Sequence, residues 1–340
     1  MEFPFELRVC AWAEREWHRF AEHDAFFVAR QLGLQRRRWD TVVVEADPTK
    51  LDARAAFGER ALDSDLRFLV EHAPREWAYY RDCLPDPGYP WRYVREHIHR
   101  AAARDALEKR RNGNRIEIRR TNFYPEWVER VVAIENKPDL DASAARALAD
   151  QMERDVALGL ADEVWVATRE AGERALLAEM PVEAGVLAFD DEMRADVAWR
   201  PTTLSPGEPG THIESRADDG CEFDYRSPGW KRDRRYRIAE RAYERGWRSY
   251  ADTMRPDCRY FDLRAAEHDF VPYCHAKGRE VTAAECSGSC GEFSPEPPAW
   301  RTKGWPIEGG PGQTVKRVLA DQRRRRRPAA EKIKWEEDEK

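Results

Sequence analysis

Two acidic residues and one lysine lie at the ends of apolar segments, where a charged side chain is expected to be buried and to have a function. Glu135 and Lys137 close the apolar run 131–137, and because side chains alternate along a strand they share one face, roughly 7 Å apart. Asp40 opens a second apolar run, at residues 39–45, in the same way. A charge at the end of an apolar strand is costly to bury without a partner, so these three positions are candidates for a functional site.

Glu6 is the fourth candidate, because a helix would surround it with apolar residues. Its neighbours three, four and seven positions away are Phe3, Val9, Cys10 and Ala13. A carboxylate centred on such a stripe faces the core and not water. It therefore needs a partner, and a cation shared with Asp40 and Glu135 is the simplest one.

These residue types together suit metal-dependent chemistry on phosphate. Carboxylates, backbone carbonyls and water make an oxygen-rich site for Mg²⁺ or Mn²⁺, with Asp40, Glu135 and Glu6 as the candidate ligands. Such an ion activates water and stabilises the charge that builds on a phosphodiester during hydrolysis. Lys137 would hold or deprotonate the attacking water, or stabilise the phosphorane. The alternative is that Glu135 and Lys137 form an ordinary ion pair at a sheet edge.

Four of the seven cysteines crowd into one stretch of the chain. They are Cys258, Cys274, Cys286 and Cys290. In a cytoplasmic chain, which we expect here, such a cluster indicates a metal site before it indicates disulfides. Four thiolates suit tetrahedral Zn²⁺, which we favour, or an iron–sulfur cluster, and His275 is an alternate ligand. The metal would hold together a small unit that is poor in core residues; the alternative is four unrelated reduced cysteines.

Composition sets the class of protein. Of the 340 residues, 41% are hydrophobic and 36% are charged, which allows a folded core with an unusually charged surface. No apolar run reaches the length of a membrane span, and the first residues carry no basic and apolar signal regions. We therefore expect a soluble, cytoplasmic protein with no membrane partner. The sequence sets no oligomeric state and allows a dimer.

Local basic segments favour a nucleic-acid partner, DNA in preference to RNA, although the net charge is −6. The candidate contacts are Arg36, Arg37, Arg38, Lys109, Arg110 and Arg111. The first three come just before Asp40, and the other three precede the hairpin signal Asn112-Gly113. Residues 230–237 interleave aromatic and cationic side chains, a pattern suited to stacking and phosphate contact. Each segment by itself also fits a solvated surface.

The elements that must position the acids alternate between helices and strands. Helices are expected at 3–20, 26–32, 141–160 and around 171–179. Strands are expected at 39–45, 131–137, 163–168 and 185–189. This order predicts an α/β fold, a mixed sheet flanked by helices.

The remaining segments predict additional units. The long gap between the two acid-bearing strands requires an inserted domain at 51–124. Helices expected there at 53–69 and 91–107, followed by a basic hairpin, resemble a winged helix-turn-helix; a helical insertion with a solvated hairpin is the alternative. The full division begins with a discontinuous core at 1–50 and 125–195, interrupted by the insertion at 51–124. A Pro- and Gly-rich linker at 196–229 follows. The last units are a Cys-rich module at 230–315, which begins with a helix at 232–246, and a charged tail at 316–340.

Taken together, the acids and the lysine resemble the PD-(D/E)XK, or restriction-endonuclease-like, nuclease superfamily. Glu6 is similar to its first-helix glutamate, Asp40 to its strand-opening aspartate, and Glu135-Asn136-Lys137 to its E-x-K signature. The resemblance implies a restriction-endonuclease-like fold and Mg²⁺- or Mn²⁺-dependent cleavage of nucleic acid. The long insertion between the two strands departs from the short hairpin that the superfamily often has.

Gln151 extends this resemblance, because many members carry a glutamine on the following helix, close to the site. An ordinary solvated helix residue is the alternative for Gln151. The resemblance covers about 1–50 and 125–190. Some nucleases of the superfamily hold an iron–sulfur cluster with one cysteine before the core, and Cys10, the only such cysteine here, lies in the core of the first helix.

The whole chain also resembles an uncharacterised family of haloarchaeal proteins, a resemblance that implies no mechanism. Two other functions stay open from the sequence. One is a non-catalytic DNA-binding or regulatory protein on a nuclease-like fold. The other is an interaction scaffold organised by the cysteine module.

Overall fold

A computed structural model of the chain describes residues 2–34, 37–140, 142–169, 180–217, 220–252, 254–266, 269–287 and 289–295, together with Arg317 and Ala320. The helix expected around 171–179 lies outside the described residues. The same holds for residues 296–315 of the expected Cys-rich module and, apart from those two residues, for the expected charged tail.

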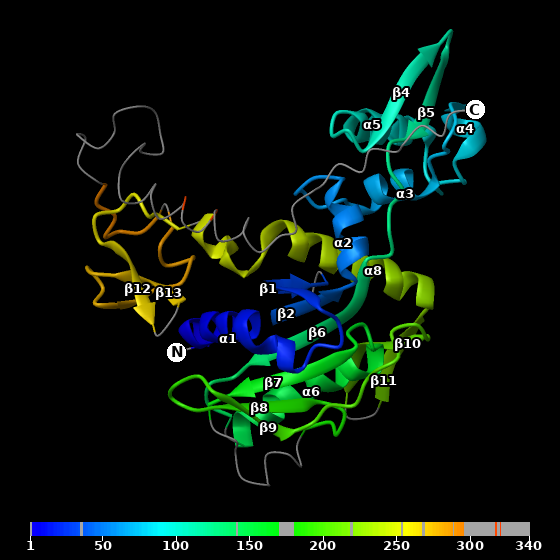
Figure 1. Ribbon diagram of the computed structural model, residues 1–340. Coiled ribbons are helices and arrows are strands. Elements are labelled where there is room, and N and C mark those ends of the chain that lie inside the picture. Colours follow the sequence, from blue (N-terminus) through cyan, green and yellow to red (C-terminus); the bar gives the residue numbers. More distant parts are fainter. Residues whose placement is uncertain are drawn as a thin grey trace.

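Six strands form one mixed sheet at the centre of the molecule (Figure 1). They are β1 (Ala25–Gly33), β2 (Arg38–Ala46), β6 (Val128–Asn136), β7 (Glu163–Thr168), β8 (Gly185–Phe189) and β9 (Ala195–Trp199). Their order is β1-β2-β6-β7-β8-β9, with β6, β7 and β8 parallel and the other neighbours antiparallel. Parallel strands need a crossover, and a helix supplies it between β6 and β7. The predicted mixed α/β architecture is confirmed.

Helices cover both faces of this sheet, and the sheet separates two hydrophobic cores. The covering helices are α1 (Glu2–Glu16), α6 (Ala142–Leu158) and α8 (Pro228–Arg245). The α1 side holds Val43 and Ile134, whereas the side of α6 and α8 holds Val42 and Ala133. Since neighbouring strand residues alternate between faces, Asp40 and Glu135 belong to the α6 and α8 side. In the part of the chain that the structure describes, no helix has both the length and the apolar character needed to cross a bilayer.

The prediction of a helix at 26–32 is wrong, because these residues lie in β1. Phe27 pairs with Val44 and Val28 pairs with Val43 in an antiparallel ladder. Aromatic and β-branched residues fit a pleated surface well, and the neighbouring β2 gives this segment a partner. Before β1, α1 ends in the short helix η1 (Trp17–Arg19).

The chain between β2 and β6 leaves the sheet and projects away from it (Figure 1). Its elements are α2 (Pro48–Ala55), α3 (Ser64–His72), β3 (Ala78–Tyr79), α4 (Tyr80–Cys83), α5 (Trp91–Ala102), β4 (Leu107–Asn112) and β5 (Arg115–Arg120). The three strands pair in the order β3-β5-β4. Gly113, with φ of 60°, turns the chain beside the Asn112–Arg115 pair, so the hairpin predicted from Asn112-Gly113 is confirmed.

The helices of this insertion are shorter than the sequence predicts. The helix expected at 53–69 is divided into α2 and α3. Gly58 has a left-handed φ of 81°, and the Asp63 side chain caps α3 by accepting a hydrogen bond from the Leu66 amide at 2.9 Å. The helix expected at 91–107 ends at Ala102, because Leu107 already begins β4.

Residues 196–229, expected as a linker, contain folded strands. After β9, the strands β10 (Gly210–Ala217) and β11 (Gly220–Arg226) pair as an antiparallel hairpin. This hairpin packs on α6, where Arg154 donates to the Ile213 carbonyl at 2.9 Å. The linker prediction is wrong because β10 and β11 pair with each other and pack on α6, and the glycines at 210 and 220 are the first residues of these strands.

The cysteine-bearing segment packs against α1. Its elements are η2 (Trp247–Asp252), β12 (Phe261–Ala266), β13 (Asp269–Cys274) and β14 (Arg279–Glu280). Val271 and Val281 lie in the same buried cluster as Phe5 and Trp12 of α1. The helix that bears Glu6 is therefore enclosed between the central sheet and the cysteine segment.

Candidate functional site

Asp40 and Glu135 meet at the end of the β2–β6 ladder. Thr41 of β2 pairs with Ile134 of β6, so Asp40 and Glu135 lie opposite each other one step further along. The Oδ2 atom of Asp40 also accepts a hydrogen bond from the Asn136 backbone amide at 3.0 Å. Strand pairing thus brings together two acids that are far apart in the sequence.

Gln31 joins this pair to Glu6. Its Nε2 atom donates to Glu6 Oε1 at 3.0 Å and to Asp40 Oδ1 at 2.9 Å. Gln31 has a left-handed φ of 53°, an uncommon conformation for a residue other than glycine. Such backbone strain often accompanies functional sites. Glu6 also accepts a hydrogen bond from Arg30 Nε at 3.0 Å.

Arg37 binds the site from the other side. Its Nη2 atom donates to Glu135 Oε2 at 3.1 Å and to Asp155 Oδ2 at 2.7 Å. Asp155 is a buried residue of α6, one helical turn beyond Gln151. One guanidinium therefore bridges the strand that bears Glu135 and the crossover helix.

The acids of this cluster hold more negative charge than their partners offset. Burial raises the pKa of Glu135 to about 7, with the charge of Asp40 as the second cause, against the opposing effect of Arg37. Burial also raises the pKa of Glu6, where Arg30 opposes the shift and the charge of Asp40 adds to it. Burial raises the pKa of Asp155 as well. Since both Glu6 and Glu135 respond to Asp40, that residue is the middle member of the cluster.

Lys137 and Gln151 complete the set expected from the sequence. Lys137 is half-buried just after β6, and its backbone amide donates to the Ala167 carbonyl at 2.8 Å. Gln151 is half-buried on α6 and lines the same cavity as Arg37 and Asp155. Lys137 therefore lies two residues after Glu135 in the chain, and Gln151 lies on the same cavity wall as Asp155.

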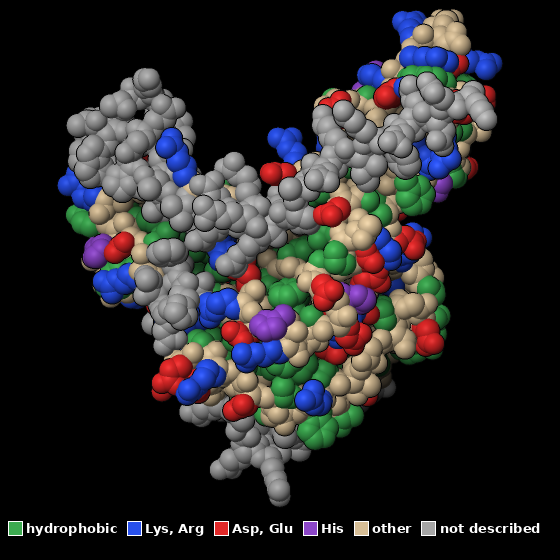
Figure 2. Space-filling model, in the orientation of Figure 1, with side chains coloured by type: hydrophobic (Ala, Val, Ile, Leu, Met, Phe, Trp, Pro, Cys, Tyr) green, Lys and Arg blue, Asp and Glu red, His purple; other side chains and the backbone are tan. Residues whose placement is uncertain are grey.

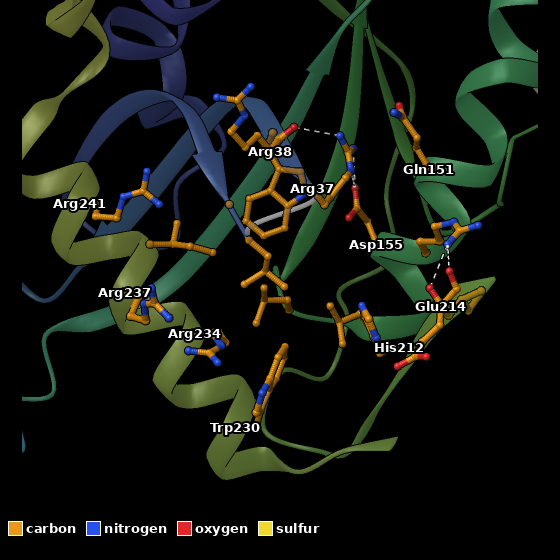
Figure 3. Close-up of a pocket in the computed structure, with 18 residues that line it drawn as sticks. Arg37, Arg38, Gln151, Asp155, His212, Glu214, Trp230, Arg234, Arg237 and Arg241 are labelled. Carbon is orange, nitrogen blue, oxygen red and sulfur yellow. Dashed lines mark hydrogen bonds and ion pairs between the residues drawn. The ribbon is translucent and has the colours of Figure 1, made fainter. Parts of the chain in front are cut away.

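A cavity of about 1100 Å³ lies beside the acids (Figure 3). Its walls come from the β1–β2 connection, α6, β10 and α8. Six arginines line it: Arg37, Arg38, Arg154, Arg234, Arg237 and Arg241. Arg37 faces this cavity and binds Glu135, so the acids lie at one end of a basic space. Arg36, the first residue of the expected triplet, lies outside the described residues.

The second basic segment, Lys109 to Arg111, is exposed on β4. Lys and Arg side chains gather at the projecting end of this lobe in Figure 2. Arg110 donates to Glu117 at 2.7 Å, whereas Lys109 contacts His99 and Arg111 donates to the Gly113 carbonyl at 2.9 Å. Two of the three cations thus keep a charge that no acid among the described residues neutralises.

The four clustered cysteines line one small cavity. They are Cys258, Cys274, Cys286 and Cys290. The cavity measures about 20 Å³, close to the space that one water needs. Burial and the neighbouring thiols raise the pKa of Cys286, and the Ser294 amide donates to Cys258 Sγ at 3.4 Å. The alternate ligand His275 is exposed and contacts Asp262 instead.

Cys10 is separate from this cluster. Its Sγ atom lies 3.2 Å from Thr41 Oγ1, behind the acids. Burial, together with the charge of Glu6, raises the pKa of Cys10 to about 12, so its thiol stays protonated. A protonated thiol is a poor metal ligand.

Within the described ranges, no three His, Cys, Asp or Glu side chains are grouped so that they could hold a metal ion as they stand. The donor types nevertheless fit the expected ions. Mg²⁺ commonly uses only one or two carboxylates and completes its shell with water and substrate phosphate. Asp40 and Glu135 supply two such carboxylates, and four thiols around one cavity supply the donors that zinc prefers.

Three residues of the site escape detection from the sequence. Gln31 was expected in a helix, Asp155 is one of many acids on an alanine-rich helix, and Arg30 follows no motif. The spacing of Gln151 and Asp155, one helical turn apart, is a usable signal for Asp155. A strand assignment for 25–33, combined with the register Arg30–Thr41 and Leu32–Trp39 of the structure, places Gln31 level with Asp40.

A family model described as a family of unknown function (DUF5787) matches residues 27–295. Because the match spans most of the chain, the chain belongs to that family. Glu6 precedes the matched segment, whereas Asp40, Glu135 and the four clustered cysteines fall within it. No curated protein and no solved structure matches the chain.

Proposed function

We propose that this member of the DUF5787 family is a metal-dependent nuclease that hydrolyses phosphodiester bonds of nucleic acid, with DNA favoured over RNA. The observation that carries the proposal is the linked cluster of Glu6, Asp40 and Glu135. Gln31 ties the first two acids, strand pairing sets the third opposite the second, and the pKa of Glu135 is raised to about 7. Buried acids with this excess of negative charge favour a cation.

The order of elements supports the same proposal. A helix bearing Glu6 is followed by β1, by β2 with Asp40, and by β6 with Glu135, after which α6 bears Gln151. This is the order that the resemblance to the restriction-endonuclease-like superfamily implies. The insertion between β2 and β6 adds a lobe and leaves their pairing intact.

Asp40 and Glu135 would hold Mg²⁺ or Mn²⁺, with Glu6 as the third acid. The ion, when bound, supplies activation of water and stabilisation of the charge on the reacting phosphate. Arg37 would then release the Glu135 carboxylate and bind substrate phosphate, to which a guanidinium binds strongly. Lys137 would hold the attacking water and take up its proton or stabilise the charge that develops on phosphorus. Gln151 would position water or a phosphate oxygen from the wall of the cavity.

The inserted lobe supports DNA as the substrate. There α3 is followed by the short strand β3, by the helices α4 and α5, and by the exposed basic hairpin β4–β5, and the strand order β3-β5-β4 suits a winged helix-turn-helix. Helices of such motifs contact the major groove of duplex DNA. In this proposal Lys109, Arg110 and Arg111 contact the DNA backbone at the projecting end of the lobe, and Arg36 and Arg38 contact it near the acids.

The test is cleavage of labelled DNA and RNA by the purified chain in Mg²⁺ or Mn²⁺. We expect cleavage that chelation abolishes and that falls at least about 100-fold in Asp40→Ala and in Lys137→Ala. Asp52→Ala and Lys50→Ala, which change exposed residues of α2, are matched controls and should keep full activity. Unchanged activity in both site variants would overturn the proposal.

The rival is a non-catalytic DNA-binding or regulatory protein on the same fold. The ion pair between Arg37 and Glu135 favours it, because an arginine there can substitute permanently for a metal. Calorimetric titration with Mn²⁺ separates the two functions. The nuclease requires heat of binding that Glu135→Gln removes, whereas the rival predicts no such heat in either protein.

The clustered cysteines support a structural metal, for which we propose Zn²⁺, with an iron–sulfur cluster as the alternative. Cys258 is buried and the other three thiols are half-buried around one cavity. The Ser294 amide that donates to Cys258 is the kind of contact that stabilises a metal-bound thiolate. A metal bound in this cavity would draw the four sulfurs to one ion.

A further inference from the structure

We propose that the arginine-lined cavity binds an unpaired, single-stranded segment of nucleic acid, an inference that rests on the nuclease function proposed above. The proposal names the form of the substrate that reaches the acids. Three properties of the cavity carry it: positive charge that is only partly neutralised on one wall, apolar side chains in the lining, and a size that excludes a duplex.

The wall formed by α8 carries positive charge that the protein only partly neutralises, since Glu244 is the one acid that opposes the shift in the pKa of Arg241 among the causes resolved for it. Arg237 and Arg241 are one helical turn apart on this wall, and Arg38 approaches them from β2 (Figure 3). Among the described residues, no ion pair or hydrogen bond holds the guanidinium of any of the three. Burial and the charges of Arg245, Arg237 and Arg38 lower the pKa of Arg241. Phosphate groups are the ligands that would relieve this repulsion.

The lining of the cavity includes apolar side chains that bases can contact. Leu34 and Ile213 are half-buried and offer surface, and the buried side chains of Trp39, Leu158, Leu160 and Ile238 support them. Bases in a double helix are stacked and paired with one another and cannot use such a surface, whereas unpaired bases can. A basic wall combined with apolar and aromatic contacts is therefore typical of sites for single strands.

Trp230 adds an aromatic ring to the same wall. It precedes Arg234, Arg237 and Arg241 on one face of α8, at spacings of four, three and four residues. Arg226 and Arg234 lie 5.2 and 5.1 Å from the centre of its ring and hold it in place. The indole stands at the end of the row of cations, where an unpaired base can contact it.

The size and position of the cavity fit a strand that leads to the acids. About 1100 Å³ holds a few nucleotides, but a duplex, whose major groove alone is about 12 Å wide, does not fit. Arg37 lines the cavity and bridges Asp155 and Glu135. A phosphate in the cavity thus reaches Arg37 directly beside the candidate cleavage site.

The test is binding of a short labelled oligonucleotide in chelator, measured by fluorescence anisotropy, so that no cleavage interferes. The inserted lobe is proposed to bind duplex DNA outside the cavity, so the test compares how far each form of nucleic acid depends on the cavity arginines. Arg237→Ala/Arg241→Ala should weaken binding of the single strand, as DNA or RNA, at least about tenfold and should leave binding of the matching blunt duplex nearly unchanged. The dependence of log K on log salt should also become shallower by about 1.4, for two lost phosphate contacts.

Arg194→Ala/Arg259→Ala is the matched control. Both residues are exposed and neither lines the cavity, so their loss removes the same two charges and should leave affinity unchanged. Trp230→Ala should weaken binding roughly 5- to 150-fold, whereas Trp230→Phe should keep most of it. Unchanged thermal melting of the arginine variant excludes misfolding.

An equal loss of duplex binding in Arg237→Ala/Arg241→Ala would overturn the proposal, as would single-strand binding that survives in that variant. These outcomes separate it from the proposed hydrolysis. Arginine-dependent strand binding without cleavage in Mn²⁺ would leave the strand site standing and refute hydrolysis. Cleavage that is confined to duplex and indifferent to Arg237 would do the reverse.

Discussion

Glu135 is the residue at which the electrostatics of the site converge. It is 7% exposed, lies opposite Asp40 and shares Arg37 with Asp155. One guanidinium cannot balance three carboxylates, and the pKa of Glu135 is raised from 4.5 to about 7. The folded protein without metal therefore binds a proton at Glu135 more strongly than the unfolded chain does.

This shift predicts how stability depends on pH. A raised pKa in the folded state contributes stability that is fully present below about pH 4.5 and is lost as pH rises through 7. A change from 4.5 to about 7 corresponds to about 3 kcal/mol. Glu135→Gln mimics the neutral acid, so the variant should lack this loss and melt at a higher temperature than the parent at pH 8. Thermal melting in chelator between pH 5 and pH 8 measures it.

Glu96→Gln is the control for this prediction, because Glu96 is exposed on α5 and forms no ion pair or hydrogen bond through its side chain with the residues that the structure describes. The control should follow the parent at every pH. Parallel pH dependence in Glu135→Gln and the parent would contradict the assignment of the shift to this residue.

At the scale of single residues, the sequence predicts the acids that lie at the ends of apolar strands. Asp40 and Glu135 head or end apolar strands, and their pairing follows once β2 and β6 are neighbours. Gln31 is hidden, because its role depends on a left-handed backbone conformation and on contacts to two other elements. Arg37 is visible as a cation, but its partners Glu135 and Asp155 are distant in sequence.

At the scale of elements, α8 forms one wall of the cavity, and the buried acid Glu240 holds this helix in place. Glu240 of α8 is 1% exposed and accepts four hydrogen bonds. They come from Arg54 Nε at 3.0 Å, Arg54 Nη2 at 2.5 Å, the Leu62 amide at 2.8 Å and the Tyr124 hydroxyl at 2.7 Å. Through these contacts the base of the inserted lobe fixes the helix that carries Arg237 and Arg241.

Removal of this acid should therefore destabilise the protein strongly. Glu240→Ala leaves the Arg54 cation, which is 0% exposed, without its partner, and breaking a buried pair in this way costs about 3–5 kcal/mol. We expect that loss in urea unfolding, with weaker single-strand binding. Arg54→Met/Glu240→Leu, which removes both charges, should recover most of the stability. A loss below about 1 kcal/mol in Glu240→Ala would contradict the anchoring role.

The bounds of α8 show which local signals predict elements. The sequence placed its start at 232, but the helix begins at Pro228, with Ser227 accepting a hydrogen bond from the Trp230 amide at 3.2 Å. A serine cap followed by proline is a standard start signal, so this boundary was predictable. The error at β1 has a different cause, because strand identity there depends on pairing with β2.

At the scale of the whole molecule, the arrangement of lobes depends on contacts that no local pattern reports. The cysteine segment meets α1 through Trp247 and Arg248, which donate to Glu14 at 2.9 Å each, and through Arg8, which donates to Glu280. More than 200 residues separate the partners in each pair. The sequence predicts a cysteine-rich unit, but the enclosure of the helix that bears Glu6 by this unit comes from tertiary packing.

That enclosure links the cysteine metal to the stability of the core, which gives the last prediction. If the four thiols hold zinc, the purified chain should contain about one equivalent by mass spectrometry of the metal, and iron with visible absorption would indicate the cluster instead. Cys286→Ser should lose the metal and lower the melting temperature by roughly 5–10 °C, because Val271 and Val281 would no longer be held against α1. Cys221→Ser, at an exposed cysteine outside the cavity, should change neither quantity. A metal-free chain that melts at the same temperature with and without Cys286 would show that the cysteines are unrelated thiols and that packing alone holds this lobe on α1.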